Sequence, residues 1–310
     1  MINYINRLRF KPNILVVGDV MVDLFSFCSS NKTSAEVDIP IAYVVNEEMR
    51  LGGAANVWNN VHGLNANAFL CGAVGLDTAG KFVKEQIKDF TYIIKQKRTT
   101  IKHRYYLNNI QVFRVDSDVI CDHIKKAYNR CLEKIFNENI DAIIISDYLK
   151  GFCNEYFIKN LISFANKKNI FIAVDSKFNQ ISRYANVDLI KINKNEFQVV
   201  FNEKFNIKNA QKIRYQLKKN NISKLLVTLG KDGMVLITQN NIIKYQSNAI
   251  NNADVIGAGD CVIACYVIAK LNTFNEQDCL NFAGLCTEYC LQKIGTKNFS
   301  INEYKKEMYE

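Results

Sequence analysis

Short apolar runs alternate with amphipathic stretches along most of the chain. The stretches 154–168 and 207–220 carry apolar residues three and four positions apart, which is typical of amphipathic helices. The apolar runs have the length and composition of buried strands: "ILVVGD" (14–19), "NAFLCGAVG" (67–75), "DAIIISD" (141–147), "IFIAVD" (170–175), "DLIKIN" (188–193) and "KLLVTLG" (224–230). This alternation predicts an α/β fold, a mainly parallel sheet with helices on both faces.

Polar residues or glycine end or follow five of these runs. Right-handed crossovers bring the carboxyl ends of parallel strands to one edge of the sheet, where ligands bind in open α/β folds. A polar residue can also simply terminate a strand, so each position alone has a structural explanation. Together they predict a ligand site at that edge, formed by Asp19, Asp147, Asp175, Asn193 and Gly230.

Residues 33–47 and 100–116 break the strand–helix rhythm. Both segments alternate between apolar and polar positions and have high β propensity. They predict a small antiparallel flap inserted into the main fold. Because no linker, internal repeat or low-complexity tail is visible, we expect one domain over residues 1–310 that carries this flap.

Composition excludes several function classes. The net charge of +10 would suit nucleic acid or an acidic substrate, but the lysines are scattered and form no dense basic run with aromatic residues. We therefore expect no nucleic-acid partner. No stretch of about 20 apolar residues occurs, and the N-terminus lacks the apolar region of a signal peptide, so we expect a cytoplasmic protein without membrane association.

The ten cysteines never form C-x-x-C and lie mostly within apolar segments. Without an export signal, this pattern predicts reduced thiols in the core. The three histidines have no spacing that suits zinc, so we expect no zinc site.

The segment "NNADVIGAGDCVIACYVIAKL" (251–271) carries the strongest chemical signal. Gly257 and Gly259 allow close approach of a ligand to the backbone, and the free N–H groups of the following helix form an anion site. Asp260 then lies beside the bound anion, although an acid is also an ordinary residue at a helix start. The chemical interpretation is phosphoryl transfer, with Asp260 accepting the proton of an attacking hydroxyl. We expect the helix dipole to lower the pKa of Asp260.

Two other nucleotide-binding patterns fit poorly. "GLDTAGKF" (75–82) matches G-x-x-x-x-G-K but has Phe82 where a P-loop needs Ser or Thr for Mg²⁺. No G-x-G-x-x-G follows the first strand, which disfavours a Rossmann dehydrogenase.

"NADVIGAGDCVIA" resembles the D-T/V-x-G-A-G-D signature of the ribokinase-like (PfkB) carbohydrate kinases. Three further stretches resemble motifs of that family in the same order, namely 49–81, "INKNEF" (192–197) and "VTLGKDGMVLI" (227–237). The resemblance implies a three-layer ribokinase-like fold whose flap acts as a lid. It also implies ATP and Mg²⁺ as cofactors, a small-molecule sugar substrate and a homodimer formed through the lid.

Within the family, the chain resembles the heptose 7-phosphate kinases of the ADP-heptose pathway, which supplies lipopolysaccharide core precursors. The similar stretches are "VVGDVMVDLF" (16–25), "RLGGAANV" (50–57), "SDYLKG" (146–151), "VDSKFNQISRY" (174–184) and "QKIGTKNFS" (292–300). Leu51 and Ser176 stand where the pattern has proline, and Ile256 and Cys261 where it has small or hydroxylated residues. These departures leave the exact sugar open.

The resemblance assigns roles to individual residues. Asp260 corresponds to the catalytic base, and the backbone of Gly257, Ala258 and Gly259 to the anion hole. The nucleotide and Mg²⁺ side comprises Asn193, Glu196, Thr228, Gly230, Gly233 and Asn281, with Glu196 reaching the metal through water. The sugar side comprises Asp23, Gly52, Gly53 and Asn56.

A phosphorylated sugar also needs cations, and the candidates are Lys177, Arg104 and Lys150, each of which alone could be a solvated surface charge. Arg104 could pair with phosphate through two nitrogens. Asp254 and the backbone near Ile256 are candidates for a monovalent-cation site.

The expected reaction is ATP-dependent phosphorylation of heptose 7-phosphate at its anomeric hydroxyl. The alternatives are a related kinase acting on fructose, ribose, a phosphorylated hexose or a nucleoside, and a nucleotide- or sugar-binding regulator without catalysis. Because no H-x-G-H motif occurs, we expect the adenylylation step of the heptose pathway to belong to another polypeptide.

Overall fold

A nine-stranded sheet forms the centre of the molecule in the computed structural model, which describes residues 1–87, 92–108, 110–121, 125–248, 256–292 and 298–309. Neighbouring strands are parallel from β11 to β5, and β12 and β13 are antiparallel at one edge. The order across the sheet is β13 (Ile242–Tyr245), β12 (Met234–Thr238), β11 (Lys224–Thr228), β10 (Leu189–Asn193), β9 (Phe171–Ser176), β8 (Ala142–Asp147), β1 (Asn13–Gly18), β4 (Asn67–Val74) and β5 (Tyr92–Lys95). All six apolar runs of the sequence form strands of this main sheet.

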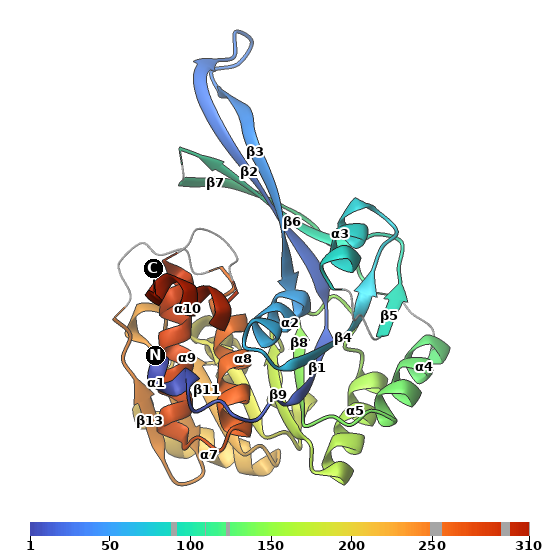
Figure 1. Ribbon diagram of the computed structural model, residues 1–310, viewed down its shortest axis with the longest axis vertical. Helices are drawn as coiled ribbons and strands as arrows, with labels where there is room; N and C mark the ends of the chain where they lie inside the picture. The colour runs from blue at the N-terminus through green and yellow to red at the C-terminus, as the bar shows by residue number, and fades with distance from the viewer. Residues whose placement is uncertain (88–91, 109, 122–124, 249–255, 293–297, 310) are drawn as a thin grey trace.

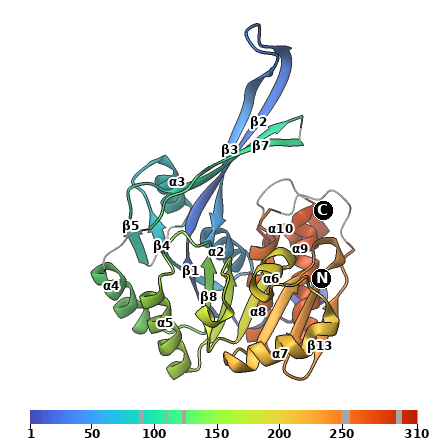
Figure 2. The same cartoon turned by 180° about the vertical axis from the view of Figure 1, so that it is seen from behind.

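Helices cover both faces of the main sheet, which confirms the predicted α/β architecture (Figures 1 and 2). Alternate side chains of β1 enter two separate cores, Ile14 and Val16 the first and Leu15 and Val17 the second. The first core includes side chains of α1 (Ile2–Ile5), α2 (Ala54–Gly63), α3 (Thr78–Gln86), α8 (Ala258–Leu271), α9 (Glu276–Leu291) and α10 (Ile301–Tyr309). The second includes side chains of α4 (Lys125–Phe136), α5 (Glu155–Lys168), α6 (Lys194–Phe201) and α7 (Ala210–Lys219).

A second sheet of four strands forms the lid, which projects from the main body in Figure 1. Its order is β3 (Pro40–Gly53), β2 (Val20–Thr33), β6 (Thr100–Leu107) and β7 (Ile110–Ser117). The predicted segment 100–116 corresponds to β6 and β7, but 33–47 covers only the outer part of the β2–β3 hairpin. The hairpin starts earlier because the buried, apolar beginning of β2 continues the run of β1, so the sequence pattern has no break there. The prediction of an antiparallel flap is wrong for the central pair, because β2 and β6 are parallel.

Two observations concern the predictions made from composition. All ten cysteines are buried, and none of them is part of a disulfide. Within the described ranges, the structure contains no helix that is long and apolar enough to cross a membrane.

Asp77 of the P-loop-like stretch caps α3, where its carboxylate accepts the N–H of Gly80 at 2.9 Å.

The segment before α10 packs closely against the end of α2. Asn60 accepts the backbone N–H of Phe299 at 2.9 Å, and a Cβ atom added at Gly63 would lie 2.0 Å from the carbonyl oxygen of Phe299. That space is closed by backbone rather than by a flexible side chain. Gly63 therefore allows the chain near its C-terminus to dock on α2.

We predict that Gly63→Ala destabilises the protein, although alanine is normally the better helix residue. Overpacking against the backbone of Phe299 should lower the free energy of unfolding by about 1–3 kcal/mol. Urea unfolding can be followed by the fluorescence of Trp58, the chain's single tryptophan, which lies in the same helix. Lys167→Ala, at an exposed position in the last turn of α5, is the control. Unchanged or increased stability of Gly63→Ala would contradict the close packing.

Candidate active site

The carboxyl ends of β8 to β11 open into a cavity of about 500 Å³. Four of the five residues predicted to gather at this edge line the cavity: Asp147, Asp175, Asn193 and Gly230. Lys177, the anion-hole residues and Asp260 also line it. The parallel topology thus brings together residues that are more than 100 positions apart in the sequence.

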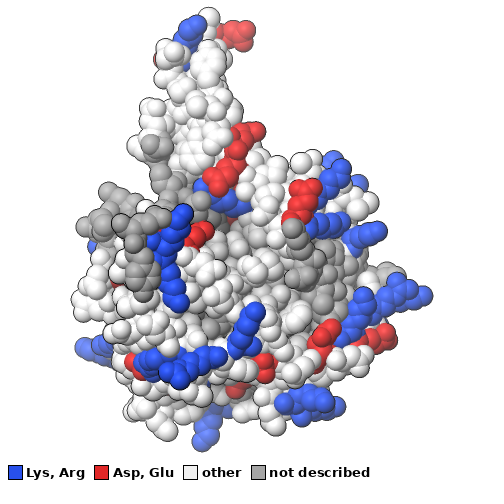
Figure 3. All heavy atoms as spheres, in the orientation of Figure 1, with Lys and Arg blue, Asp and Glu red and all other residues white. Residues whose placement is uncertain are grey.

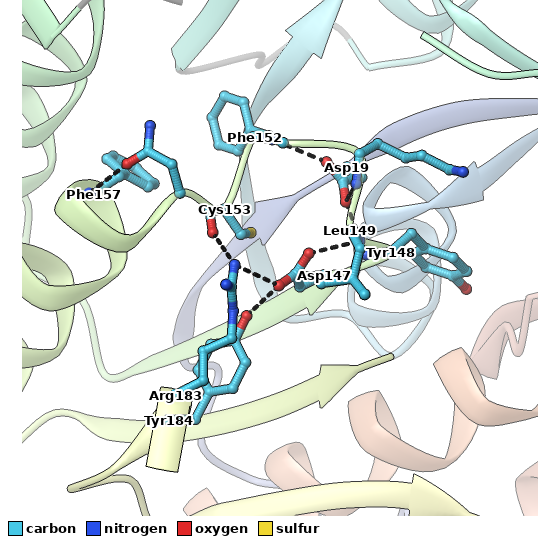
Figure 4. Close-up of polar contacts among 12 residues, drawn as sticks. Asp19, Asp147, Tyr148, Leu149, Phe152, Cys153, Phe157, Arg183 and Tyr184 are labelled. Atoms are coloured by element: carbon cyan, nitrogen blue, oxygen red, sulfur yellow. Dashed lines mark hydrogen bonds and ion pairs between the residues drawn. The ribbon is translucent and has the colours of Figure 1, made fainter. Parts of the chain in front are cut away.

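Asp19, the fifth predicted edge residue, does not line this cavity but holds the loop after β8. Its carboxylate accepts the backbone N–H groups of Tyr148, Lys150 and Phe152 at 2.8, 3.0 and 3.2 Å (Figure 4). Burial raises the pKa of Asp19 to about 6, and repulsion from Asp147 contributes to the rise. Asp19 therefore fixes the backbone that carries Tyr148.

Asp147 anchors the same loop from its other side. Its Oδ1 accepts the N–H of Leu149 at 2.8 Å, and its Oδ2 accepts the Tyr184 hydroxyl at 2.5 Å and Arg183 at 3.3 Å. Figure 4 shows the ring of Tyr148 directed away from this network. Both carboxylate oxygens of Asp147 are thus used in hydrogen bonds that hold the loop after β8.

Asp260 lies in the first turn of α8 and is only 5% exposed. Its Oδ2 accepts the side-chain amide of Asn56 at 2.7 Å, and its Oδ1 accepts the hydroxyl of Tyr148 at 3.4 Å. Gly257, the residue before the helix, has a φ of 78°, a left-handed conformation that favours glycine. The sequence motif therefore places a buried carboxylate in the first turn of α8.

The expected lowering of the pKa of Asp260 is wrong. Burial raises its pKa to about 7, and repulsion from Asp175 adds to the rise, while the Asn56 hydrogen bond and Lys191 oppose it. Desolvation of the carboxylate outweighs the helix dipole, whose effect is modest even in partly buried sites. Asp260 is therefore a stronger base than the sequence suggests, with a pKa close to neutral pH.

A buried lysine lies directly behind the anion hole. The Nζ of Lys191 is 2.7 Å from Asp175 Oδ2, and a Cβ atom added at Gly259 would lie 2.3 Å from this Nζ. Burial alone would lower the pKa of Lys191, but attraction to Asp175 and Glu196 raises it, so the ammonium group stays charged. Sequence reasoning missed Lys191, although a lysine within the apolar run "DLIKIN" was a usable signal.

Asn193 and Glu196 form a capping box at the start of α6. Asn193 Oδ1 accepts the N–H groups of Asn195 and Glu196 at 2.9 Å, and Glu196 Oε2 accepts the N–H of Asn193 at 2.7 Å. Burial and repulsion from Asp175 raise the pKa of Glu196. Asn193 and Glu196 thus cap α6, whatever part they play in organising Mg²⁺, which stays a prediction.

A site for Mg²⁺ needs oxygen ligands. Among the described residues, no group of three or more His, Cys, Asp or Glu side chains could hold a metal ion. Mg²⁺ beside nucleotides typically takes one or two carboxylates and completes its shell with phosphate oxygens and water. Glu196, which lines the cavity and whose Oε2 alone is used by the capping box, fits this kind of site.

Three of the four residues predicted for the nucleotide pocket line the cavity, namely Thr228, Gly230 and Gly233. The fourth, Asn281, is not among the residues that line the cavity, and its place near the adenine stays a prediction. It lies about one turn before the cavity-lining Gly284 of α9, where its amide donates to the hydroxyl of Tyr4 at 3.2 Å. Asn281 therefore helps to attach α1 to α9.

The residues predicted for the sugar lie where the lid joins the main body. Asn56 reaches Asp260 from α2, and Gly53 directly precedes that helix. Gly52 adjoins Asp23, since a Cβ atom added at Gly52 would lie 2.9 Å from Asp23 Oδ2. The lid strands thus bring Asp23, Gly52, Gly53 and Asn56 to the side of Asp260.

Two of the three predicted phosphate-binding cations already have anionic partners. Arg104 is 5% exposed and pairs with Asp23 at 2.5 Å, so its charge is neutralised inside the lid rather than presented to a phosphate. Lys150 pairs with Asp118 at 2.5 Å. Lys177 alone of the three lines the cavity without a carboxylate partner in the described part of the chain.

Asp254, predicted as part of a monovalent-cation site, lies outside the described residues, as does most of the similar stretch 292–300. That cation site stays a prediction.

The charge distribution also bears on possible partners. Figure 3 shows the basic side chains of one face scattered over the body, with acidic side chains between them. The lysines that are separated in the sequence are thus not gathered into one patch on this face.

The chain is similar in sequence to a known family and to characterised relatives. The model of the pfkB family of carbohydrate kinases matches residues 11–303. The chain is 32% identical over 300 residues to the bifunctional protein HldE of Campylobacter jejuni strain RM1221 and 33% identical over 302 residues to that of Helicobacter pylori strain G27. These alignments cover 95% and 94% of this chain but only 64% and 65% of the relatives' own lengths.

Solved structures share the fold at lower identity. Arabidopsis thaliana ribokinase complexed with ribose and ATP superposes with a TM-score of 0.74 at 16% identity, covering 96% of this chain and 98% of that one. Escherichia coli phosphofructokinase-2 in complex with potassium superposes with a TM-score of 0.74 at 18% identity, covering 95% of this chain and 97% of that one. The family match over nearly the whole chain and the ribokinase-like fold agree: the chain belongs to the pfkB family of carbohydrate kinases.

Proposed function

We propose that the protein transfers the γ-phosphoryl group of ATP to the anomeric hydroxyl of a heptose 7-phosphate, forming the 1,7-bisphosphate. The observation that carries this proposal is the buried Asp260 carboxylate, held by Asn56 and Tyr148 beside the N-terminus of α8. The choice of sugar is supported by the identity to the HldE proteins and by the heptose-kinase-like stretches of the sequence.

Asp260 acts as the general base. Its pKa of about 7 lets a large fraction of the carboxylate be ionised at neutral pH while keeping it basic enough to accept the proton of the attacking hydroxyl. Tyr148 keeps its own proton, because burial and the adjacent Asp260 raise the pKa of its hydroxyl. Asn56 and Tyr148 thus donate to the two carboxylate oxygens and orient them.

The transferred phosphoryl group would lie between Asp260 and the anion hole. Backbone N–H groups around Gly257, Ala258 and Gly259 would face an anion at this position, with the ammonium group of Lys191 next to Gly259. Fixed donors and a fixed positive charge stabilise a loose phosphoryl-transfer transition state without reorganisation.

The two substrates would approach from different sides. ATP would occupy the cavity past Thr228, Gly230 and Gly233, and Mg²⁺ near Glu196 would neutralise charge on its phosphates. The sugar would bind under the lid, with its hydroxyls at Asp23 and Asn56. Closing the lid would exclude water and limit wasteful hydrolysis of ATP.

The exposed apolar side chains of the lid support a homodimer. In the outer hairpin Tyr43, Val44 and Val45 are 46, 55 and 72% exposed, and in β7 Val112 and Phe113 are 58 and 61% exposed. Tyr43 and Val44 are consecutive in a strand and point to opposite faces, so both faces of the hairpin carry uncovered apolar area. Two-stranded hairpins are marginal in water, which favours covering by the lid of a second copy.

We predict that Asp260→Asn lowers kcat by about 10²–10⁴-fold, the span expected for loss of a general base. The amide keeps the size of the side chain, so binding of ATP and sugar should persist. ADP release with ATP, Mg²⁺ and heptose 7-phosphate measures the effect. Asp278→Asn, which removes a carboxylate paired with Arg7, is the control. Full activity of Asp260→Asn would exclude Asp260 as the base.

We predict that kcat/KM falls below about pH 7, because Asp260 must be ionised to accept a proton. The Asn56 hydrogen bond lowers the pKa of Asp260, so Asn56→Leu should move the acid limb of the pH profile to higher pH. Ionisation of the substrate phosphates is the same for both proteins and cancels in the comparison. An acid limb that stays in place or moves to lower pH in Asn56→Leu would contradict this assignment.

We predict that the wild-type protein sediments as a dimer and that Val45→Glu shifts it toward monomer, because the new charge would be desolvated between the two lids. Tyr215→Glu, at a position of α7 that is 65% exposed, is the matched control and should leave the assembly unchanged. Sedimentation velocity over a range of concentrations distinguishes the two states. A wild-type monomer, or equal behaviour of both variants, would refute dimerisation through the lid.

A further inference from the structure

Two lysines converge on the ring of Tyr148. The Nζ atoms of Lys102 and Lys177 both lie 4.7 Å from the centre of this ring. Lys102 belongs to β6 of the lid, and Lys177 directly follows β9 of the main sheet. Because each ammonium is 4.7 Å from the same point, the two charges are at most twice that distance apart.

Neither ammonium group has an ion-pair partner within the described ranges, whereas two buried cations nearby do. Lys191 pairs with Asp175, and Arg104 pairs with Asp23. Lys102 is partly buried, and both burial and repulsion from Lys177 lower its pKa, while attraction to Asp23 and Asp116 offsets only part of this. Two like charges brought together without a counterion favour the binding of an anion between them.

The position of Tyr148 relates this pair to the chemistry. Its hydroxyl contacts Asp260 Oδ1 at 3.4 Å, while its ring carries the two ammonium groups. The two lysines therefore contact the ring of the tyrosine whose hydroxyl contacts the proposed base. An anion bound by the lysines and the sugar hydroxyl that Asp260 would deprotonate would therefore occupy different places on the two sides of Tyr148.

We propose that Lys102 and Lys177 form the subsite for the phosphate that the sugar substrate already carries. This inference rests on the proposed function, and it identifies the substrate class as sugars phosphorylated at a carbon remote from the reacting hydroxyl. Lysine is a point-charge ligand for phosphate, and hydrogen bonds to charged groups are stronger than neutral ones. Because one lysine comes from the lid and the other from the main body, a phosphate bound to both would also hold the lid closed.

The test measures binding to the full-length chain by isothermal titration calorimetry, without ATP. The probes are heptose 7-phosphate and fructose 6-phosphate, each compared with its unphosphorylated sugar. We expect the wild-type protein to bind the phosphorylated form more tightly. Lys102→Met and Lys177→Met keep the aliphatic stem on the Tyr148 ring but remove the charge, and each should weaken binding of the phosphorylated sugar about tenfold or more.

The unphosphorylated sugars and two further variants provide the controls. Affinity for the unphosphorylated sugars should change by less than roughly twofold in both methionine variants. Lys102→Arg, which keeps the positive charge, should retain most of the preference for the phosphorylated form. Lys81→Met, at an exposed position of α3, should behave like the wild-type protein.

The outcomes separate this inference from the proposed function. Equal losses for phosphorylated and free sugars, or no preference of the wild-type protein, would overturn the subsite. Turnover of free sugars but of no phosphorylated sugar would overturn the subsite and the substrate, and leave a kinase. Lysine-dependent binding of sugar phosphates without any ADP release would overturn the proposed function and leave the subsite.

Discussion

The burial of the Asp260 carboxylate at the start of α8 is the constraint on which the rest of the site depends. A carboxylate that is 5% exposed and close to other acids is costly to ionise, and its raised pKa expresses that cost. Asn56 and Tyr148 offset part of it, each with one hydrogen bond. Both donors must therefore be held firmly, and much of the surrounding structure serves this purpose.

Each donor has its own support. Asn56 is part of α2, and the segment around Phe299 docks on the end of this helix through Asn60 and Gly63. Tyr148 lies in a loop whose backbone N–H groups are bound by the buried Asp19 (Figure 4). Elements from both ends of the chain thus determine the position of one carboxylate.

Charge balance organises the remainder of the site. Asp175 pairs with Lys191 and Asp23 pairs with Arg104, so that most acids near Asp260 are matched by a buried cation. Buried ion pairs contribute little net stability, but loss of one partner leaves an uncompensated charge. In this site the two ion pairs hold charged groups in place before any substrate binds. One pair holds the ammonium group of Lys191 beside Gly259, and the other holds the carboxylate of Asp23 under the lid.

The sequence was sufficient for the architecture and for the place of Asp260 at the start of α8, because both depend on local patterns. Six apolar runs and the glycines before Asp260 can be read without knowledge of long-range contacts. The sign of the Asp260 pKa shift could not be predicted, since burial and the approach of Asp175 arise only from packing. Lys191 and Lys102 were overlooked because their surroundings depend on residues from other parts of the chain.

The most direct test of the central claim is ADP release by the wild-type protein with ATP and Mg²⁺ across a substrate panel. The panel comprises heptose 7-phosphate in both anomeric series, sedoheptulose 7-phosphate, fructose 6-phosphate, fructose, ribose and adenosine. We predict the highest kcat/KM for a heptose 7-phosphate, with free sugars and adenosine far below it. No ADP release with any of these compounds would contradict the assignment of a sugar kinase with Asp260 as its base.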